Sequence, residues 1–224
     1  MVSAILFECR KRASSRYALI ALMLAFCASV VHAGNPEDSG TADSAVLQPE
    51  GLDSASAYDA TWSNTFYLGN MTENKWEELF QGPDFVDNYL VGYALTYDRP
   101  ISERWSVGAE LQFTYHFGDQ DYGEIGLPLT MRYRPVEPWP KFFESVAFGV
   151  GLSYTTDESD VEIDNGNGEE VSQTLIYWMF ETEFATNNPN RRWFVRIHHR
   201  SDGFETITPE GGSNALVLGI RQDF

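Results

Sequence analysis

Strict alternation of apolar and polar residues is the feature that most limits how this chain can fold. It is clearest in residues 104–117, where apolar and aromatic side chains occupy every second position: Trp105, Val107, Ala109, Leu111, Phe113, Tyr115 and Phe117. Neighbouring side chains of a β-strand point to opposite faces, so this period of two predicts a strand with one apolar and one polar face.

Seven further segments alternate in the same way, which gives eight predicted strands: residues 61–70, 88–98, 104–117, 123–134, 144–155, 171–185, 192–201 and 214–224. An even number of strands of about ten residues is typical of bacterial outer-membrane barrels. The terminal Phe224 resembles the aromatic assembly signal of such barrels. We therefore predict an all-β fold over residues 61–224, an eight-stranded antiparallel transmembrane β-barrel of the outer-membrane type.

A soluble lipocalin-like barrel is the alternative fold. It has the same number of strands, but its apolar residues point inward and its charges outward. Alternation alone does not determine which face of a strand points inward. Trp and Tyr residues near the strand ends, together with an N-terminus that is typical of exported proteins, favour the membrane-spanning form.

Residues 1–33 have the three parts of a secretory signal peptide: a basic start, a short apolar stretch over 18–31 and a small-residue cleavage site at Val31-His32-Ala33. The apolar stretch is shorter than an ordinary membrane helix, although a short membrane anchor is an alternative. Residues 34–60 contain six acids and no Lys or Arg, which predicts a flexible, acidic periplasmic lead-in. We expect export to the bacterial outer membrane.

The net charge of the chain is −18, and removal of a signal with net charge +3 leaves −21. This charge argues against nucleic acid as a partner. It is compatible with a membrane surface where acidic loops share divalent cations with phosphate groups. Both cysteines, Cys9 and Cys27, lie within the predicted signal, so we expect no disulfide in the mature chain.

Acidic residues are dense in the segment 156–170, which carries Asp157, Glu158, Asp160, Glu162, Asp164, Glu169 and Glu170. We interpret this segment as a solvated acidic loop, with collection of Ca²⁺ or Mg²⁺ as the alternative. The spacing of a defined calcium-binding loop is absent, and we predict neither a specific metal site nor another cofactor.

Charged residues also occur on the predicted inward faces. The acids are Glu110, Glu124, Glu181 and Glu183, and the bases are Arg132, Arg134, Arg192, Arg196 and Arg221. An eight-stranded barrel is filled by its own side chains, and buried charges normally pair. We therefore predict a structural network of ion pairs inside the barrel.

A periplasmic N-terminus fixes the orientation of every strand. The connections 99–103, 135–143 and 186–191 are then periplasmic, and the connections 71–87, 118–122, 156–170 and 202–213 are extracellular. The strand 192–201 runs outward, so its last residues lie at the depth of the outer leaflet.

This strand places His199 and Ser201 on its outward face, in one row with Trp193, Val195 and Ile197. His198 and Arg200 face inward. A polar pair on the lipid-facing side is costly unless it has a use. Serine is a weak nucleophile that needs an adjacent base, so His199 and Ser201 form a candidate catalytic pair. The alternative is a pair of interfacial polar residues beside lipid phosphates.

The run R-I-H-H-R-S at 196–201, followed by a last strand that ends in an aromatic residue, resembles the lipid A 3-O-deacylase (PagL) family and its relatives described as acyloxyacyl hydrolases. Members are eight-stranded outer-membrane barrels. Their H-x-S pair on the penultimate strand and an acid on the last strand form a Ser-His-Glu triad on the barrel exterior. The resemblance implies an esterase that hydrolyses an ester-linked acyl chain of lipid A, with lipopolysaccharide of the outer leaflet as its partner.

On this resemblance, Ser201 is the nucleophile, His199 is the general base, and Asn214 stands at the position of the family's acid. The loop residues Glu205 and Glu210 are alternative acids.

The family also has an asparagine after the serine that supports the oxyanion hole. This chain has Asp202 there, followed by Gly203 with a backbone N–H. The departures at 202 and 214 support an alternative, a non-catalytic structural or adhesion barrel that keeps the family scaffold.

Overall fold

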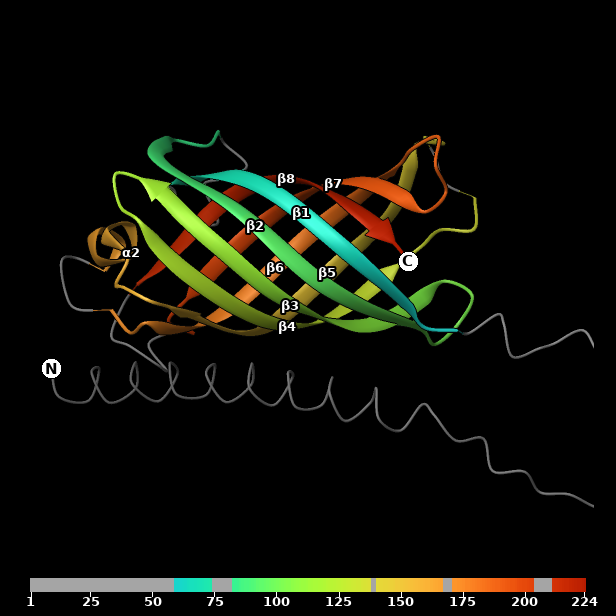
Figure 1. Ribbon diagram of the computed structural model, residues 1–224, viewed down its shortest axis with the longest axis horizontal. Helices are drawn as coiled ribbons and strands as arrows, with labels where there is room; N and C mark the ends of the chain where they lie inside the picture. Colours follow the sequence, from blue (N-terminus) through green and yellow to red (C-terminus); the bar gives the residue numbers. More distant parts are fainter. Residues whose placement is uncertain (1–58, 74–81, 138–139, 167–170, 204–210) are drawn as a thin grey trace, which may run out of the picture. The chain divides into compact units, whose positions relative to one another are not determined.

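Eight antiparallel strands close into a barrel in the computed structural model, which describes residues 59–73, 82–137, 140–166, 171–203 and 211–224 (Figure 1). The strands are β1 (Thr61–Thr72), β2 (Phe85–Pro100), β3 (Trp105–Gly118), β4 (Tyr122–Tyr133), β5 (Phe143–Thr155), β6 (Thr174–Ala185), β7 (Arg191–Ser201) and β8 (Gly212–Asp223). Each strand pairs with its neighbours in the sequence, and β8 pairs with β1. The predicted eight-stranded barrel is thereby confirmed.

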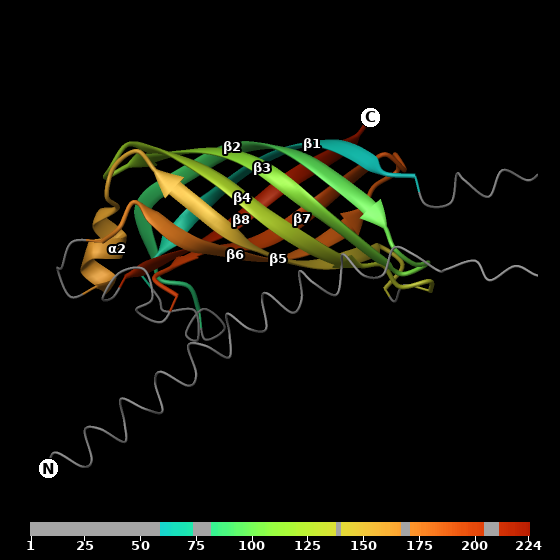
Figure 2. The same cartoon turned by 90° about the horizontal axis from the view of Figure 1, so that it is seen from below.

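One short helix, α2 (Asp160–Asn165), lies between β5 and β6. It covers the end of the barrel opposite to the C-terminus and to the start of β1 (Figures 1 and 2). No helix among the described residues is long and apolar enough to cross a membrane. The predicted signal and acidic lead-in fall on residues 1–60, of which only the last two are described.

The outer surface of the barrel is apolar and its interior is polar. Phe66, Leu68 and Leu127 are each more than half exposed on the outer rows, whereas Glu110 and Arg196 are fully buried inside. This arrangement is the reverse of a soluble lipocalin-like barrel. The structure therefore confirms the outer-membrane type of barrel, and it decides the question that alternation left open.

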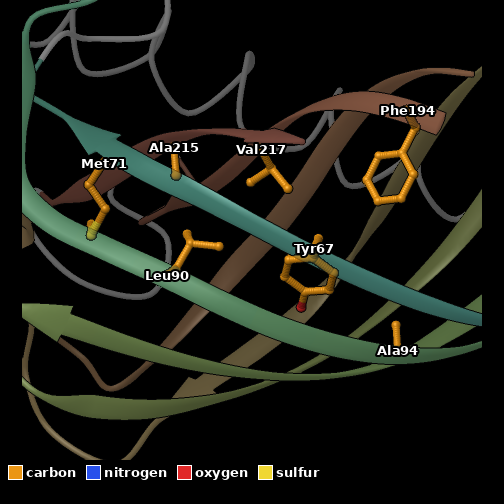
Figure 3. Close-up of a cluster of buried hydrophobic side chains, with 7 residues drawn as sticks. All are labelled: Tyr67, Met71, Leu90, Ala94, Phe194, Ala215 and Val217. Carbon is orange, nitrogen blue, oxygen red and sulfur yellow. The ribbon is translucent and has the colours of Figure 1, made fainter. Parts of the chain in front are cut away.

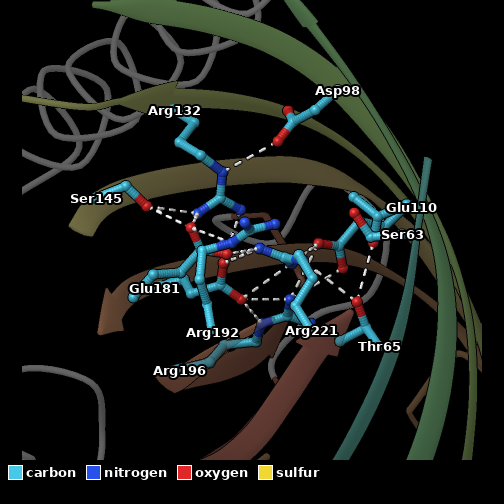
Figure 4. Close-up of polar contacts among 12 residues, drawn as sticks. Ser63, Thr65, Asp98, Glu110, Arg132, Ser145, Glu181, Arg192, Arg196 and Arg221 are labelled. Carbon is cyan, nitrogen blue, oxygen red and sulfur yellow. Dashed lines mark hydrogen bonds and ion pairs between the residues drawn. The ribbon is translucent and has the colours of Figure 1, made fainter. Parts of the chain in front are cut away.

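A network of ion pairs fills one part of the interior, and Figure 4 shows how its side chains converge from several strands. Glu181 lies at its centre and accepts hydrogen bonds from Arg132 at 2.8 Å, Arg196 at 2.5 Å and Arg221 at 2.8 Å. Arg221 also binds Glu110 at 2.5 Å. The predicted pairing of these residues is confirmed.

Glu124 is the exception to that prediction, because its closest partners are two histidines. Its Oε2 lies 2.9 Å from Nε2 of His116 and 3.1 Å from Nε2 of His198, whereas Arg200 is 3.9 Å from its Oε1. The cause is the register of the strands, which places His116 and His198 nearer to Glu124 than any arginine of the main network.

Apolar side chains fill another part of the interior: Tyr67, Met71, Leu90, Ala94, Phe194, Ala215 and Val217 (Figure 3). Two of the rings lie over glycines that face them across the sheet. A Cβ added to Gly92 would lie 2.1 Å from the Tyr67 ring, and one added to Gly219 would lie 2.3 Å from the Phe194 ring. Glycine at these positions makes room for the rings in the narrow interior.

The acidic segment between β5 and β6 is not a fully solvated loop, and this part of the sequence prediction is wrong. Glu162 of α2 is buried, and it accepts hydrogen bonds from Arg200 and Ser213, both at 2.8 Å. Burial raises the pKa of the Glu162 carboxyl, and the neighbouring Arg200 opposes this shift. The sequence shows only that this segment is rich in acids. It does not show that Arg200, which points into the barrel, lies close enough to bind one of them.

Candidate active site

The side chains of β7 alternate as predicted. The inward row, Arg192, Phe194, Arg196, His198 and Arg200, is buried, while Trp193 on the outward row is 46 % exposed. His199 and Ser201 continue this outward row at the end of the barrel where α2 lies. The two residues therefore lie in the outward row, as the sequence predicts, but His199 is buried at 7 % exposure and Ser201 is only partly exposed.

His199 and Asn214 are brought together by the pairing of β7 with β8. They face each other in the ladder, and Nδ1 of His199 lies 2.6 Å from Oδ1 of Asn214. An amide oxygen only accepts hydrogen bonds, so Nδ1 carries the proton and Nε2 is the basic nitrogen. Trp178 of β6 flanks the imidazole with a ring-centroid distance of 4.4 Å. These contacts fix the tautomer and the orientation of the ring.

Ser201 does not use His199 as its partner in the structure. Its hydroxyl donates to the carboxylate of Asp202 at 3.2 Å and accepts from the N–H of Gly203 at 3.1 Å. Within the described residues, the expected hydrogen bond between Ser201 and His199 is not formed. The reason is that residues two apart on a strand are separated by about 6.5 Å, so the hydroxyl reaches its own turn more easily.

The turn after β7 positions Asp202 and Gly203. Gly203 has a φ of 68°, in the left-handed region that glycine adopts without strain, and Asp202 donates its N–H to the carbonyl of Gly211 at 3.1 Å. The turn thus directs the backbone N–H of Gly203 at the hydroxyl oxygen of Ser201. The alternative acids Glu205 and Glu210 lie outside the described residues.

The pairing of the strands extends this polar site to β1, which the sequence prediction missed. Thr72 faces Asn214 across the β8–β1 ladder, and Asn70 lies two residues earlier in the same outward row. The predicted strand ended at residue 70, so Thr72 was assigned to the following loop. Continuing the alternation beyond Phe66 and Leu68 would have placed both residues in the outward row, in which Thr72 is buried.

The histidine pair around Glu124 lies on the other side of the barrel wall. His198 follows the inward row, so it is separated from His199 although the two are adjacent in sequence. In the described part of the chain, no group of three or more His, Cys, Asp or Glu side chains is arranged to hold a metal ion.

These features define an outer-membrane-type β-barrel with a polar cluster in the outward rows of β7 and β8. No protein-family profile matches the chain, and no curated protein matches it significantly.

Among solved structures, the chain is similar to the outer membrane enzyme PagL, with 9 % identity, 71 % of this chain and 98 % of that chain covered, and a TM-score of 0.47. It is also similar to Neisserial surface protein A, with 11 % identity and a TM-score of 0.45; the match covers 74 % of this chain and 99 % of that chain. A third similar structure is the attachment invasion locus protein Ail of Yersinia pestis, with 13 % identity and a TM-score of 0.43; the match covers 74 % of this chain and 97 % of that chain. These similarities concern the barrel architecture and assign no residue a role.

Proposed function

We propose that this protein is an outer-membrane esterase that removes an ester-linked acyl chain from lipid A. The observation that carries the proposal is the His199–Asn214 pair, an oriented imidazole in the outward row of β7 with a serine two residues away. A base that is held by a third group and stands beside a hydroxyl is the general arrangement of a serine nucleophile site. The resemblance of residues 196–201 to the lipid A 3-O-deacylase family supports the same substrate.

The location of the site supports a substrate that stays in the membrane. The outward rows of the barrel are apolar, so they match the hydrocarbon of a bilayer. With the start of β1 on the periplasmic side, the end of β7 lies in the outer leaflet. A lipid could then reach Ser201 by lateral diffusion and needs no deep pocket.

The proposed reaction proceeds through an acyl-enzyme. The Ser201 oxygen attacks the ester carbonyl while Nε2 of His199 takes the hydroxyl proton. The bond to the sugar oxygen then breaks, and the imidazolium returns the proton to this leaving group. Water attacks the acyl-serine in the same way, which releases the fatty acid and restores the enzyme.

A rotation of the Ser201 side chain precedes this reaction. Its hydroxyl must leave the Asp202 carboxylate and turn toward His199, which is a change between staggered rotamers. The same rotation releases the N–H of Gly203, which can then donate to the developing oxyanion.

Mass spectrometry of lipid A after incubation with the purified, detergent-folded protein tests the proposal. We expect loss of one acyl chain with the wild-type protein and none with Ser201→Ala. Thr174→Ala is the matched control, because Thr174 is an outward-row hydroxyl residue near the same end of the barrel, on β6. Equal acyl release by wild type and Ser201→Ala would remove Ser201 from the mechanism.

A non-catalytic structural or adhesion barrel is the second candidate function. It is favoured by the contact between Ser201 and Asp202, since a carboxylate beside the nucleophile repels an oxyanion. This function predicts unaltered lipid A in cells that overproduce the protein, together with a partner bound by the extracellular loops.

A further inference from the structure

A polar cavity lies at the end of the barrel opposite α2, where β1 begins and β8 ends. Its volume is about 250 Å³. Polar side chains from β1, β2, β3, β7, β8 and the residue after β4 line it: Ser63, Asp98, Ser106, Arg134, Arg192 and Asp223. With the start of β1 on the periplasmic side, this end of the barrel faces the periplasm. His199 and Ser201 lie at the other end.

Solutes can reach the side chains of this cavity, in contrast to those of the network deeper in the barrel. The side chain of Arg134 is 33 % exposed and that of Asp223 is 19 % exposed, whereas the side chain of Arg221 is 1 % exposed. The volume is below the roughly 300–1,000 Å³ of sites for drug-sized ligands. A ligand of this cavity must therefore be a small solute.

Arg134 offers hydrogen-bond donors on the side of the cavity formed by β2, β3 and the end of β4. Its Nη1 donates to Oγ of Ser106 at 3.0 Å, and its Nη2 lies 3.5 Å from Oδ2 of Asp98. The second contact is longer than a charge-assisted hydrogen bond, which is about 2.7–2.9 Å. A guanidinium has five N–H donors in a planar fork that matches a carboxylate. Arg134 thus keeps donors with which it can bind the carboxylate of a solute.

Asp223 offers an acceptor on the side formed by β7, β8 and β1. Its Oδ1 accepts a hydrogen bond from the Ser63 hydroxyl at 2.7 Å and another from Nη2 of Arg192. Both contacts use Oδ1, and an ionised carboxylate has a second oxygen that accepts hydrogen bonds equally well. Oδ2 can therefore accept from the ammonium group of a solute.

The charges at this end of the barrel are balanced within one connected network of ion pairs, part of which Figure 4 shows. The network joins five carboxylates, those of Asp98, Glu110, Glu181, Glu183 and Asp223, to five guanidinium groups, those of Arg132, Arg134, Arg192, Arg196 and Arg221. A solute with a net charge would leave one charge uncompensated in a partly buried site, which is destabilising. A solute that carries both charges preserves the balance.

We propose that this cavity binds a small zwitterion, with the carboxylate on Arg134 and the ammonium group on Asp223. Two sources share this chemistry. A free amino acid carries both charges on one carbon atom, and a short peptide carries them at its two ends. The site goes beyond the proposed esterase, since it lies at the opposite end of the barrel and shares no residue with it.

NMR titration of the isotope-labelled, detergent-folded protein tests this inference. The matched probes are L-alanine, propionate, which lacks the ammonium group of alanine, and ethylamine, which lacks its carboxylate. We expect alanine to shift the backbone amide signals of the residues that line the cavity. Its Kd should be at least about tenfold below that of either single-charge probe, the gain from one further hydrogen bond to a charged group. Tighter binding of L-alanyl-L-alanine than of alanine would identify peptides as the ligand, and weaker binding would identify free amino acids.

Two substitutions locate the two charges of the ligand. Arg134→Gln should weaken alanine binding about tenfold and leave ethylamine binding unchanged, and Asp223→Asn should weaken alanine binding about tenfold and leave propionate binding unchanged. Arg104→Gln is the matched control, because Arg104 is an exposed arginine just before β3 at the same end of the barrel and lies outside the cavity lining. Heat-modifiable migration in gels verifies that each variant is folded.

Equal affinities for alanine, propionate and ethylamine would overturn the inference, as would alanine binding that is unchanged in both Arg134→Gln and Asp223→Asn. The absence of any signal shift with both zwitterions would overturn it too. Ser201→Ala protein should bind alanine as wild type does. A failure of the esterase proposal therefore leaves this site standing, and a failure of this site leaves the esterase proposal standing.

Discussion

In the proposed mechanism Asn214 takes the place of the acid of a Ser-His-acid triad, and its amide oxygen accepts the Nδ1 proton of His199 at 2.6 Å. This contact orients the imidazole as a carboxylate would. It stabilises the imidazolium of the transition state less, because an amide has no net charge. In the proposed esterase, the residue at 214 would therefore affect the rate of acyl release more than the orientation of His199.

Asn214→Asp should raise the rate of acyl release, since the substitution is isosteric and adds the missing negative charge. We expect an increase of at least about tenfold, equivalent to roughly 1.4 kcal/mol of transition-state stabilisation. The measurement is the initial rate of fatty-acid release from lipid A by the detergent-folded protein. Asn214→Ala, which removes the partner of Nδ1, should lower the rate and serves as the control. A rate that is the same in all three proteins would mean that His199 is not the base.

At the scale of elements, β7 separates two polar systems that lie on opposite faces of the barrel wall. His199 binds Asn214 in the outward row, while His198 and Arg200 bind Glu124 and Glu162 inside. The helix α2 is attached to this inner system through Glu162, and its Asn165 donates to the carbonyl of Gly212 on β8 at 2.8 Å. The helix thus holds the ends of both strands that carry the candidate site.

Glu162→Ala should detach α2 from the barrel end, because it removes the partner of Arg200 and Ser213 from a buried position. We expect faster proteolytic cleavage between β5 and β6 while the barrel itself stays folded, as measured by limited proteolysis and heat-modifiable migration. Asp164→Ala is the control, since Asp164 lies in the same helix with an exposed side chain. Similar cleavage rates in the two variants would show that Glu162 does not anchor the helix.

The whole molecule is stabilised by charges inside and apolar side chains outside. In the interior, removal of one member of the ion-pair network leaves its partners buried and unpaired, which costs far more than the pair contributes. On the exterior, the cost of a charge depends on its depth in the bilayer. Each of these properties predicts a different response to substitution.

Arg221→Met should destabilise the barrel by about 3–5 kcal/mol, because Glu110, Glu181 and Glu183 lose a shared cation. The control is Arg191→Met, which removes an exposed arginine whose Nε binds Gln222. Surface substitutions of this kind change stability by less than about 0.5 kcal/mol. Urea-induced unfolding in lipid vesicles measures both. A loss for Arg221→Met no larger than that of the control would contradict a structural role of the network.

Leu68→Arg should destabilise the barrel in vesicles by about 2–4 kcal/mol, since Leu68 lies on the outward row near the middle of β1 and is 63 % exposed. Val136→Arg, in the connection after β4, should cost at most about 1 kcal/mol, because this position lies at the rim. Unfolding of the reconstituted proteins gives both values, and equal costs would place Leu68 outside the hydrocarbon.

The sequence by itself determined the number of strands, their bounds to within three residues and the row on which His199 and Ser201 lie. It could do so because a period of two is a local property of each strand. Three further features depend on barrel closure and strand register, which join residues far apart in the chain. They are the row that faces outward, the contact of His199 with Asn214 and the position of Thr72 opposite Asn214. The Ser201–Asp202 contact and the burial of Glu162 were decided by tertiary structure too, because each depends on which partner lies nearest in space.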